Sequence, residues 1–370
     1  MSELDEKTER LQRMLLQEGL GGVLLSAQHN FAWLTCGGNN GVDLSRENGA
    51  ALLLVRADGR RFVLASNSEM PRMLAEEVSE NDFEPLEVSW QDEKAATNYV
   101  LEKVKTLLQN GDLATDIALE PMTRAIENKI AHCRYYLTGT ELDRYRTLGS
   151  DAGRAIVAVI EKLTPGATEI EIAETIRHEF GLRGMTSVVT LVAADERISN
   201  YRHPVPTGNR WRKTLLLVTC AKRGGLIVSL SRMICAGDAS DDLKRRTASA
   251  AYVNACLLDA TRTGATGADL YQTAAAAYAG QGFADEINFH HQGGATGYKT
   301  REWVAHPKST ETVLASQAFA WNPSITGTKI EETCIVNDDD VEMITPSPDF
   351  PTISTKVNGR EYISPGILSI

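Results

Sequence analysis

The sequence lacks the features that mark secreted, membrane-spanning and nucleic-acid-binding proteins. Its apolar runs, such as residues 50–55 and 215–218, are far shorter than the roughly 20 residues that a spanning helix needs. The first 13 residues are highly charged and contain no apolar signal-peptide core. A net charge of −11 argues against nucleic acid and anionic membranes as partners. We therefore expect a cytoplasmic protein that binds neither.

Cysteine pairs with metal-ligand spacing are also missing. The six cysteines are scattered without a CxxC motif, which excludes the usual patterns of structural zinc. Several lie in apolar runs, so we expect reduced and mostly buried thiols. A nucleophilic role for Cys220 is disfavoured, because an apolar strand raises the pKa of a thiol.

The first third of the chain predicts a small α/β domain over residues 1–136. An amphipathic helix (4–18), a buried strand (21–25) and a short helix (28–34) precede a hairpin around Asp58-Gly59. Further predicted helices (69–78, 93–108, 122–131) alternate with short strands (86–88, 116–119). Such alternation is typical of α/β architecture.

Residues 137–370 predict a second domain of class α+β. A capping box at Thr138–Glu141 begins a helix that runs to about residue 163. Threonine- and glycine-rich turns at 164–168 and 263–266 each follow a long helix (142–163, 239–261) and precede another helix, which indicates two related halves. Chance recurrence of common turn residues is the alternative. The strands are expected in hairpins, as a curved antiparallel sheet backed by helices (187–192, 214–220, 226–235, 319–325, 329–336, 341–344).

Residues 289–302, with the sequence FHHQGGATGYKTRE, suit the wall of a pocket. Glycines let the backbone approach a ligand, and histidine readily exchanges a proton near neutral pH. The alternative is an irregular turn with two exposed histidines.

Taken in order, these segments resemble the pita-bread family, which includes creatinase, prolidase, aminopeptidase P and methionine aminopeptidase. The resemblance spans the chain and depends on five segments, namely Tyr201-Arg202-His203-Pro204, the 215–237 hairpin, His291-Gln292-Gly293-Gly294, Trp321-Asn322-Pro323 and Lys329-Ile330-Glu331-Glu332-Thr333. It implies a small N-terminal α/β domain, a pseudo-twofold pita-bread catalytic domain, hydrolase activity and a homodimer.

The departures from the family concern its metal ligands. The two hairpin aspartates of the metallopeptidases fall on Val218 and Ser229, and the first glutamate falls on Asn322. Only His291 and Glu331 remain of five ligands, and a two-metal site needs bridging carboxylates. We therefore expect no catalytic metal and no other cofactor; a single ion would need a further ligand such as His290.

The resemblance to creatinase, the metal-free member, implies hydrolysis of an amide or amidine-like C–N bond in a small, carboxylate-bearing molecule. His203 is then the general acid and base, with His291 and Glu331 as its partners, and Arg301 binds the substrate carboxylate. The full set of expected substrate-binding residues is Arg301, Glu302, Asn322, Ser229, Ser231, Tyr298 and Arg46, the last acting across a dimer. Ser231 replaces a glutamate of creatinase, which argues against creatine itself as the substrate.

Two alternatives remain from the sequence. One is a metallopeptidase of the Xaa-Pro class acting on short peptides, and the other is an inactive binding module of the same fold. Within the pocket, adjacent strand residues face opposite sides. We therefore expect His290 to point away from it, and only one of Glu331 and Glu332 to enter it.

Overall fold

The computed structural model describes residues 1–96, 98–108, 111–119, 123–337 and 340–370. It divides into two compact units, Met1–Arg134 and Tyr135–Ile370. Among the described residues, no helix combines the length and the apolar character needed to cross a membrane.

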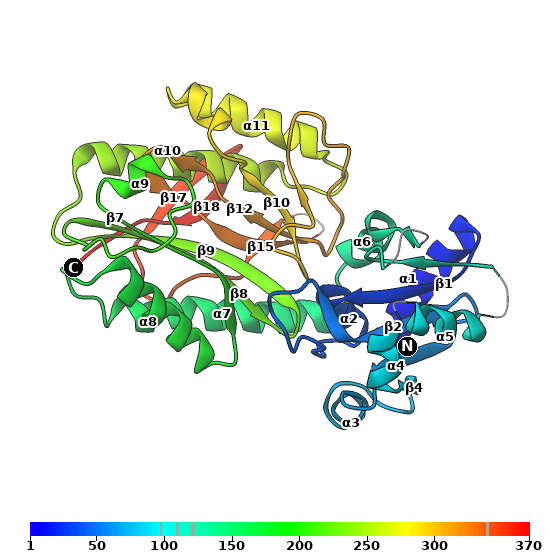
Figure 1. Cartoon of the computed structure of the whole chain (residues 1–370). Helices are drawn as coiled ribbons and strands as arrows, with labels where there is room; N and C mark the ends of the chain where they lie inside the picture. The colour runs from blue at the N-terminus through cyan, green and yellow to red at the C-terminus, as the bar shows by residue number, and fades with distance from the viewer. Residues whose placement is uncertain (97, 109–110, 120–122, 338–339) are drawn as a thin grey trace. The chain divides into compact units, whose positions relative to one another are not determined.

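The first unit is built on one mixed sheet with the strand order β4-β3-β2-β1-β5-β6 (Figure 1). The predicted hairpin forms from β2 (Asn48–Arg56) and β3 (Arg61–Ser66), and β1 (Leu20–Ala27) lies beside it. The remaining strands are β4 (Glu84–Val88), β5 (Asp112–Thr115) and β6 (Arg124–Ala125). The helical segments are α1 (Glu3–Glu18), α2 (Gln28–Leu34), α3 (Met70–Arg72), η1 (Met73–Glu77), α4 (Trp90–Ala95), α5 (Tyr99–Leu107) and α6 (Glu127–Tyr135).

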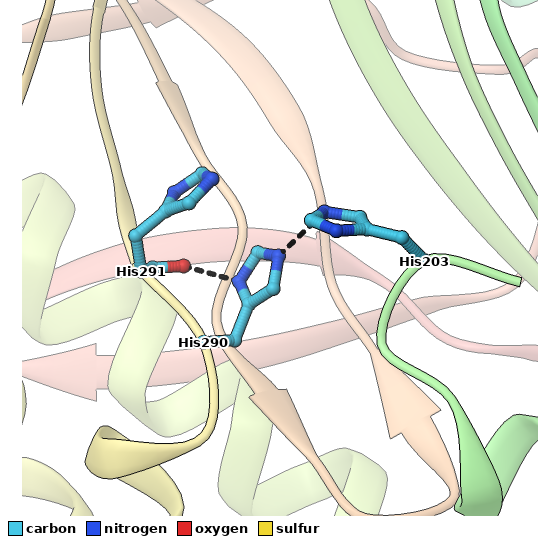
Figure 2. Close-up of side chains that lie close together, drawn as sticks. All are labelled: His203, His290 and His291. Atoms are coloured by element: carbon cyan, nitrogen blue, oxygen red, sulfur yellow. Dashed lines mark hydrogen bonds between the residues drawn. The ribbon is translucent and has the colours of Figure 1, made fainter.

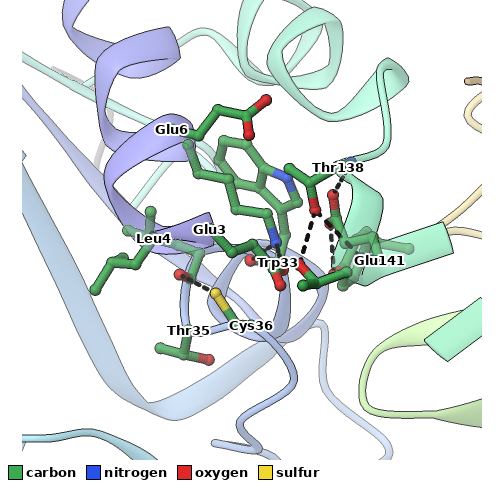
Figure 3. A network of polar contacts seen from close by, with 12 residues as sticks. Glu3, Leu4, Glu6, Trp33, Thr35, Cys36, Thr138 and Glu141 are labelled. Atoms are coloured by element: carbon green, nitrogen blue, oxygen red, sulfur yellow. Dashed lines mark hydrogen bonds and ion pairs between the residues drawn. The ribbon is translucent and has the colours of Figure 1, made fainter. Parts of the chain in front are cut away.

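Buried charges fix the helices of this unit. The ammonium of Lys7 is fully buried and donates to Glu3 Oε1 at 2.7 Å and to the carbonyl of Trp33 at 2.6 Å; Figure 3 labels both partners. Asp116 accepts from the backbone N–H groups of Ser26 and Ala27 at 2.8–2.9 Å. These bonds hold α1 and α2 against β1, because a buried charge is stable only when it is paired.

Three helices or strands of this unit differ from those that the sequence predicts. The helix expected over 93–108 is two helices, α4 and α5. The strand expected over 116–119 lies earlier, as β5, because Asp116 uses its carboxylate to cap the β1–α2 corner instead of continuing a strand. The predicted start of the next helix, residue 122, lies outside the described residues, and α6 begins at Glu127.

The second unit contains two similar helix–helix–strand halves, as the repeated turns predict. The first half has α7 (Gly139–Ile160) and α8 (Glu169–Gly181), and the second has α10 (Asp241–Ala260) and α11 (Gly267–Gly280). Both α8 and α11 begin with a capping box, at Thr168 and Thr266. The predicted capping box of Thr138 and Glu141 also forms (Figure 3). The short segments α9 (Arg197–Asn200) and η2 (Ala284–Asn288) follow.

Two sheets carry the strands of this unit. One has the order β19-β9-β8-β7, and the other has the order β11-β10-β12-β15-β16 (Figure 1). Their strands are β7 (Thr186–Ala194), β8 (Thr214–Arg223), β9 (Leu226–Cys235), β10 (Gly293–Thr296), β11 (Trp303–Val304), β12 (Ala318–Trp321), β15 (Glu332–Val336), β16 (Val341–Met343) and β19 (Ile367–Ser369). Two hairpins complete the unit, β13 (Ser324–Ile325) with β14 (Thr328–Lys329), and β17 (Thr352–Val357) with β18 (Arg360–Pro365).

The two sheets join where β9 and the start of β15 lie side by side. The backbone N–H of Ser231 donates to the carbonyl of Glu331 at 3.0 Å. The Thr333 hydroxyl accepts from the Ser229 N–H at 2.8 Å and donates to the Ser229 carbonyl at 3.0 Å. This junction places residues of both sheets around one site.

Close packing of α7 generates a stability prediction. A Cβ on Gly149 would lie 2.1 Å from the carbonyl oxygen of Ile344, whereas a Cβ on Gly181, at the end of α8, would meet nothing within 4 Å. We expect Gly149→Ala to lower the free energy of unfolding by about 1–3 kcal/mol, because the backbone around Ile344 must move. Gly181→Ala should change it by less than about 1 kcal/mol. Urea denaturation of both variants measures the difference, and equal stability of the two would contradict the packing argument.

Candidate active site

Three histidines meet in the second unit (Figure 2). His203 lies between α9 and β8, and His290 and His291 lie between η2 and β10. Nε2 of His290 lies 2.9 Å from Nε2 of His203, and the rings of His290 and His291 stack with centroids 4.3 Å apart. His290, which was expected to point away from the pocket, contacts His203. This segment is a turn and not a strand, so the alternation of faces does not apply to it.

The hydrogen bonds define which ring nitrogens carry protons. Nδ1 of His290 contacts the backbone carbonyl oxygen of His291, which is an acceptor only. Nδ1 of His290 must therefore carry the proton, and its Nε2 accepts. His203 then donates through Nε2, which leaves the lone pair of its ring on Nδ1.

Two polar networks, one partly buried and one buried, hold the segments that carry these rings. Arg202, beside His203, binds Glu286 of η2 at 2.5 Å and donates to Ser324 and Thr326 at 3.1 and 2.9 Å. Tyr278 of α11 contacts the side-chain oxygen of Gln292 at 2.6 Å. Sequence reasoning missed Arg202 and Glu286 as supports. The place of Arg202 within the Tyr-Arg-His-Pro segment was the one sequence signal for its role, and Glu286 had none.

A buried carboxylate between two cations lies at the junction of the sheets. Glu331 is 3 % exposed, and its Oε1 accepts from Arg301 at 3.0 Å. The ammonium of Lys329 lies 3.4 Å from its Oε2. Lys329 was not among the predicted site residues. With one carboxylate and two cations, the three side chains carry a net positive charge.

Burial and these cations lower the pKa of all three histidines. Burial is the main cause in each case, and Lys329 adds to it for His203 and His290. Burial, Arg301 and Lys329 lower the pKa of His291 to about 4, against the opposing effect of Glu331. The rings are therefore neutral at pH 7 and can accept protons.

The other predicted residues of the strands surround this carboxylate. Ser229 Oγ lies 3.2 Å from Cys220 Sγ and 3.4 Å from Arg301. Ser231 Oγ lies 3.4 Å from the Lys329 carbonyl. Asn322 is buried, and its side-chain oxygen has no hydrogen-bond partner in the part of the chain that the structure describes. Burial and Glu331 raise the pKa of Cys220 to about 11, which agrees with the prediction against a nucleophilic thiol.

Two of the predicted substrate-binding residues have partners within the fold, and their contact with a substrate stays a prediction. The Tyr298 hydroxyl donates to Glu141 of α7 at 2.8 Å, and Glu302 accepts from the Tyr298 N–H at 3.2 Å. Both support the loop that carries Arg301. Arg46 lies on a loop of the first unit, and its role across a dimer stays a prediction.

Glu332 and the glycines of the 289–302 segment also serve the fold. Glu332 pairs with Arg232 at 2.6 Å, apart from the partners of Glu331. A Cβ on Gly293 would lie 2.1 Å from the Ala320 carbonyl oxygen, and one on Gly294 would lie 2.1 Å from that of Trp303. Gly293 and Gly294 therefore let β10 approach its neighbouring strands, and a surface for ligand approach along this segment stays a prediction.

The residues at the family's metal-ligand positions do not fit a two-metal centre. Val218 packs in an apolar cluster with Leu216 and Met233. Ser229 and Asn322 offer no carboxylate, and the charge of Glu331 is already matched by Arg301 and Lys329. Two dications need bridging carboxylates, which these positions do not supply.

The lowered pKa values generate a spectroscopic prediction. Because the folded chain holds these rings neutral, the ring nitrogens of His203, His290 and His291 should show neutral tautomers at pH 7, with Nδ1 of His290 protonated. The His291 ring should gain its proton only near pH 4. Nitrogen-15 NMR of histidine-labelled protein measures both. A cluster ring that titrates above pH 6.5 would contradict the assignment.

Comparison with known proteins adds the family context. The model of metallopeptidase family M24 matches residues 143–338, more than half of the chain. An Xaa-Pro dipeptidase of Lactobacillus delbrueckii subsp. lactis is 25% identical over 233 residues, which are 59% of this chain and 61% of that protein. The chain thus matches about three fifths of the length of this curated relative.

Solved structures agree with this fold along most of the chain. An Xaa-Pro dipeptidase from Bacillus anthracis superposes with a TM-score of 0.76 at 19% identity, covering 93% of this chain and 98% of that one. The prolidase from Pyrococcus horikoshii OT3 gives 0.77 at 17%, covering 92% and 98%. The N-terminal domain of the FACT subunit SPT16 from chickpea gives 0.70 at 10%, covering 94% and 97%. At these identities the likeness shows the fold, and the predicted pita-bread architecture is confirmed.

Proposed function

This chain belongs to metallopeptidase family M24, a family of hydrolases, and from that premise we propose that it hydrolyses the amide bond of a dipeptide-sized substrate of the Xaa-Pro type. The similarity to an Xaa-Pro dipeptidase supports this alternative over the creatinase-like substrate that the sequence first indicated. We retain from the creatinase comparison the reaction without a two-metal centre, since the metal-ligand positions do not fit one.

One observation carries the proposal: the ordered pair of His203 and His290. With Nε2–H of His203 donated to His290, and His290 anchored on a backbone carbonyl, His203 presents the lone pair of Nδ1. A neutral imidazole of this kind can take a proton from water as the water oxygen adds to the carbonyl carbon. The same proton then passes to the leaving nitrogen as the C–N bond breaks, so one histidine serves as base and then as acid.

The cations nearby support binding and charge stabilisation. Arg301 and Lys329 together exceed the charge of Glu331 by one unit, and Nε of Arg301 is buried with no hydrogen-bond partner among the described residues. A substrate carboxylate or the negative oxygen of the tetrahedral intermediate suits such a site. The hydrolysis of a short peptide that ends in a carboxylate presents both of these negative groups.

Activity without metal tests the proposal directly. The chelator-treated full chain should release proline from Xaa-Pro dipeptides, and His203→Ala should lower kcat roughly 100- to 10,000-fold, the usual contribution of a general acid–base group. His178→Ala, which removes an exposed histidine on α8, is the matched control and should keep full activity. An amino-acid assay over a panel of dipeptides, with creatine included, measures these rates. Hydrolysis that requires added Mn or Co, or hydrolysis of creatine alone, would overturn the proposal.

The charge of Lys329 predicts a shift in the pH profile. The active form of His203 is neutral, so kcat/KM should fall as the pH drops through its lowered pKa. Lys329→Met removes a cation that lowers this pKa and should move the acidic limb to higher pH. Lys329→Arg keeps the charge and should leave the limb near that of the native enzyme. A limb that stays in place in Lys329→Met would show that Lys329 does not act on the base.

A further inference from the structure

The three histidines have a second chemical capacity, which is independent of the substrate. One ring nitrogen from each of His203, His290 and His291 lies within 4.8 Å of the others (Figure 2). Imidazole nitrogens bind zinc at about 2.0–2.1 Å, which puts two tetrahedral ligands about 3.3 Å apart. Nε2 of His203 and Nε2 of His290 are already 2.9 Å apart. Small side-chain rotations therefore bring three nitrogens to ligand spacing.

The hydrogen bond of His290 prepares it as a ligand. A metal-bound histidine generally donates its second ring N–H to a carbonyl or carboxylate, which fixes the tautomer and aims the lone pair. His290 already makes this bond, from Nδ1 to the carbonyl of His291. For Nε2 of His203 to bind the same ion, its proton must move to Nδ1. This change of tautomer leaves the charge of the ring unchanged.

Hydrogen bonds and an ion pair hold the backbone around the three histidines in place before any ion binds. Arg202 ties the His203 segment to Glu286 of η2, and Gln292 fixes the other side through the buried hydroxyl of Tyr278. A site whose ligands are placed before the ion arrives loses less conformational entropy on binding.

We propose that His203, His290 and His291 form a binding site for a single divalent ion of the zinc, cobalt, nickel and copper class. Three neutral imidazoles suit these ions, whereas magnesium, calcium and manganese prefer carboxylate and carbonyl oxygens. The positive charges of Arg301 and Lys329 oppose the ion and Glu331 favours it, so binding is weaker than at a site with carboxylate ligands. Of the family's metal ligands, this set uses only His291.

Such an ion competes with the proposed reaction. Its bonds occupy the lone pair of His290 and change the tautomer of His203, and these are the groups that order the proton transfer. Zinc therefore inhibits hydrolysis, in contrast to the activation expected from a two-metal centre.

Cobalt binding to the intact chain tests the site without any substrate. After removal of metals with a chelator, titration with Co²⁺ should give one ion per chain with the visible absorption of a low-coordinate site, and calorimetry with Zn²⁺ should give the same stoichiometry. His290→Ala should weaken binding at least tenfold, and His178→Ala should leave it unchanged. Absence of saturable binding, or equal affinity in His290→Ala, would overturn the inference.

A second measurement covers the case in which His290→Ala fails to fold. In the native chain, Zn²⁺ should shift the ring-nitrogen NMR signals of the three histidines together, and unshifted signals would overturn the site. Binding without dipeptide hydrolysis contradicts only the proposed function. Hydrolysis without binding contradicts only this inference.

Discussion

The ion pairs of Glu331 with Arg301 and Lys329 are the interaction on which the candidate site depends. Glu331 is buried at the junction of the two sheets, and its backbone carbonyl accepts a bond from β9. A buried carboxylate without partners would be very costly, so the cations are needed to keep it ionised there. The same cations lower the pKa of His291, and Lys329 also acts on His203 and His290. One cluster of charges therefore serves both the fold and the protonation state of the site.

The side chains of this site carry positive charge where the metallopeptidases of the family carry negative charge. Where the metallopeptidase members hold cations with carboxylates, this chain has Val218, Ser229 and Asn322, together with two cations of its own around the remaining glutamate. Positive charge is still available to stabilise an anion, but it comes from side chains that cannot be removed by a chelator. The histidines are then available for proton transfer or for binding a different ion, because the chain lacks the carboxylate pair that would hold two metal ions beside them.

The support of the histidines shows how the fold creates a site from separate segments. His203 precedes β8, whereas His290 and His291 follow η2, so almost ninety residues separate them in the chain. A partly buried ion pair of Arg202 and Glu286 joins the two segments, and Tyr278 holds the His291 side through Gln292.

The sequence alone determined the architecture, the family and most of the helices and strands. The capping box at Thr138, the threonine- and glycine-rich turns at 164–168 and 263–266, and the hairpin at Asp58-Gly59 are local signals, so their positions could be predicted without knowing the rest of the fold. The loss of metal ligands was equally visible, because it is a matter of residue type at a known motif. Only the tertiary structure decided where the side chains point and which residues they contact. His290 meets His203 because its segment is a turn, Lys329 pairs with Glu331 from the neighbouring strand β14, and Tyr298 bonds to Glu141 more than 150 residues away. Such contacts depend on packing between distant segments, which no local pattern encodes.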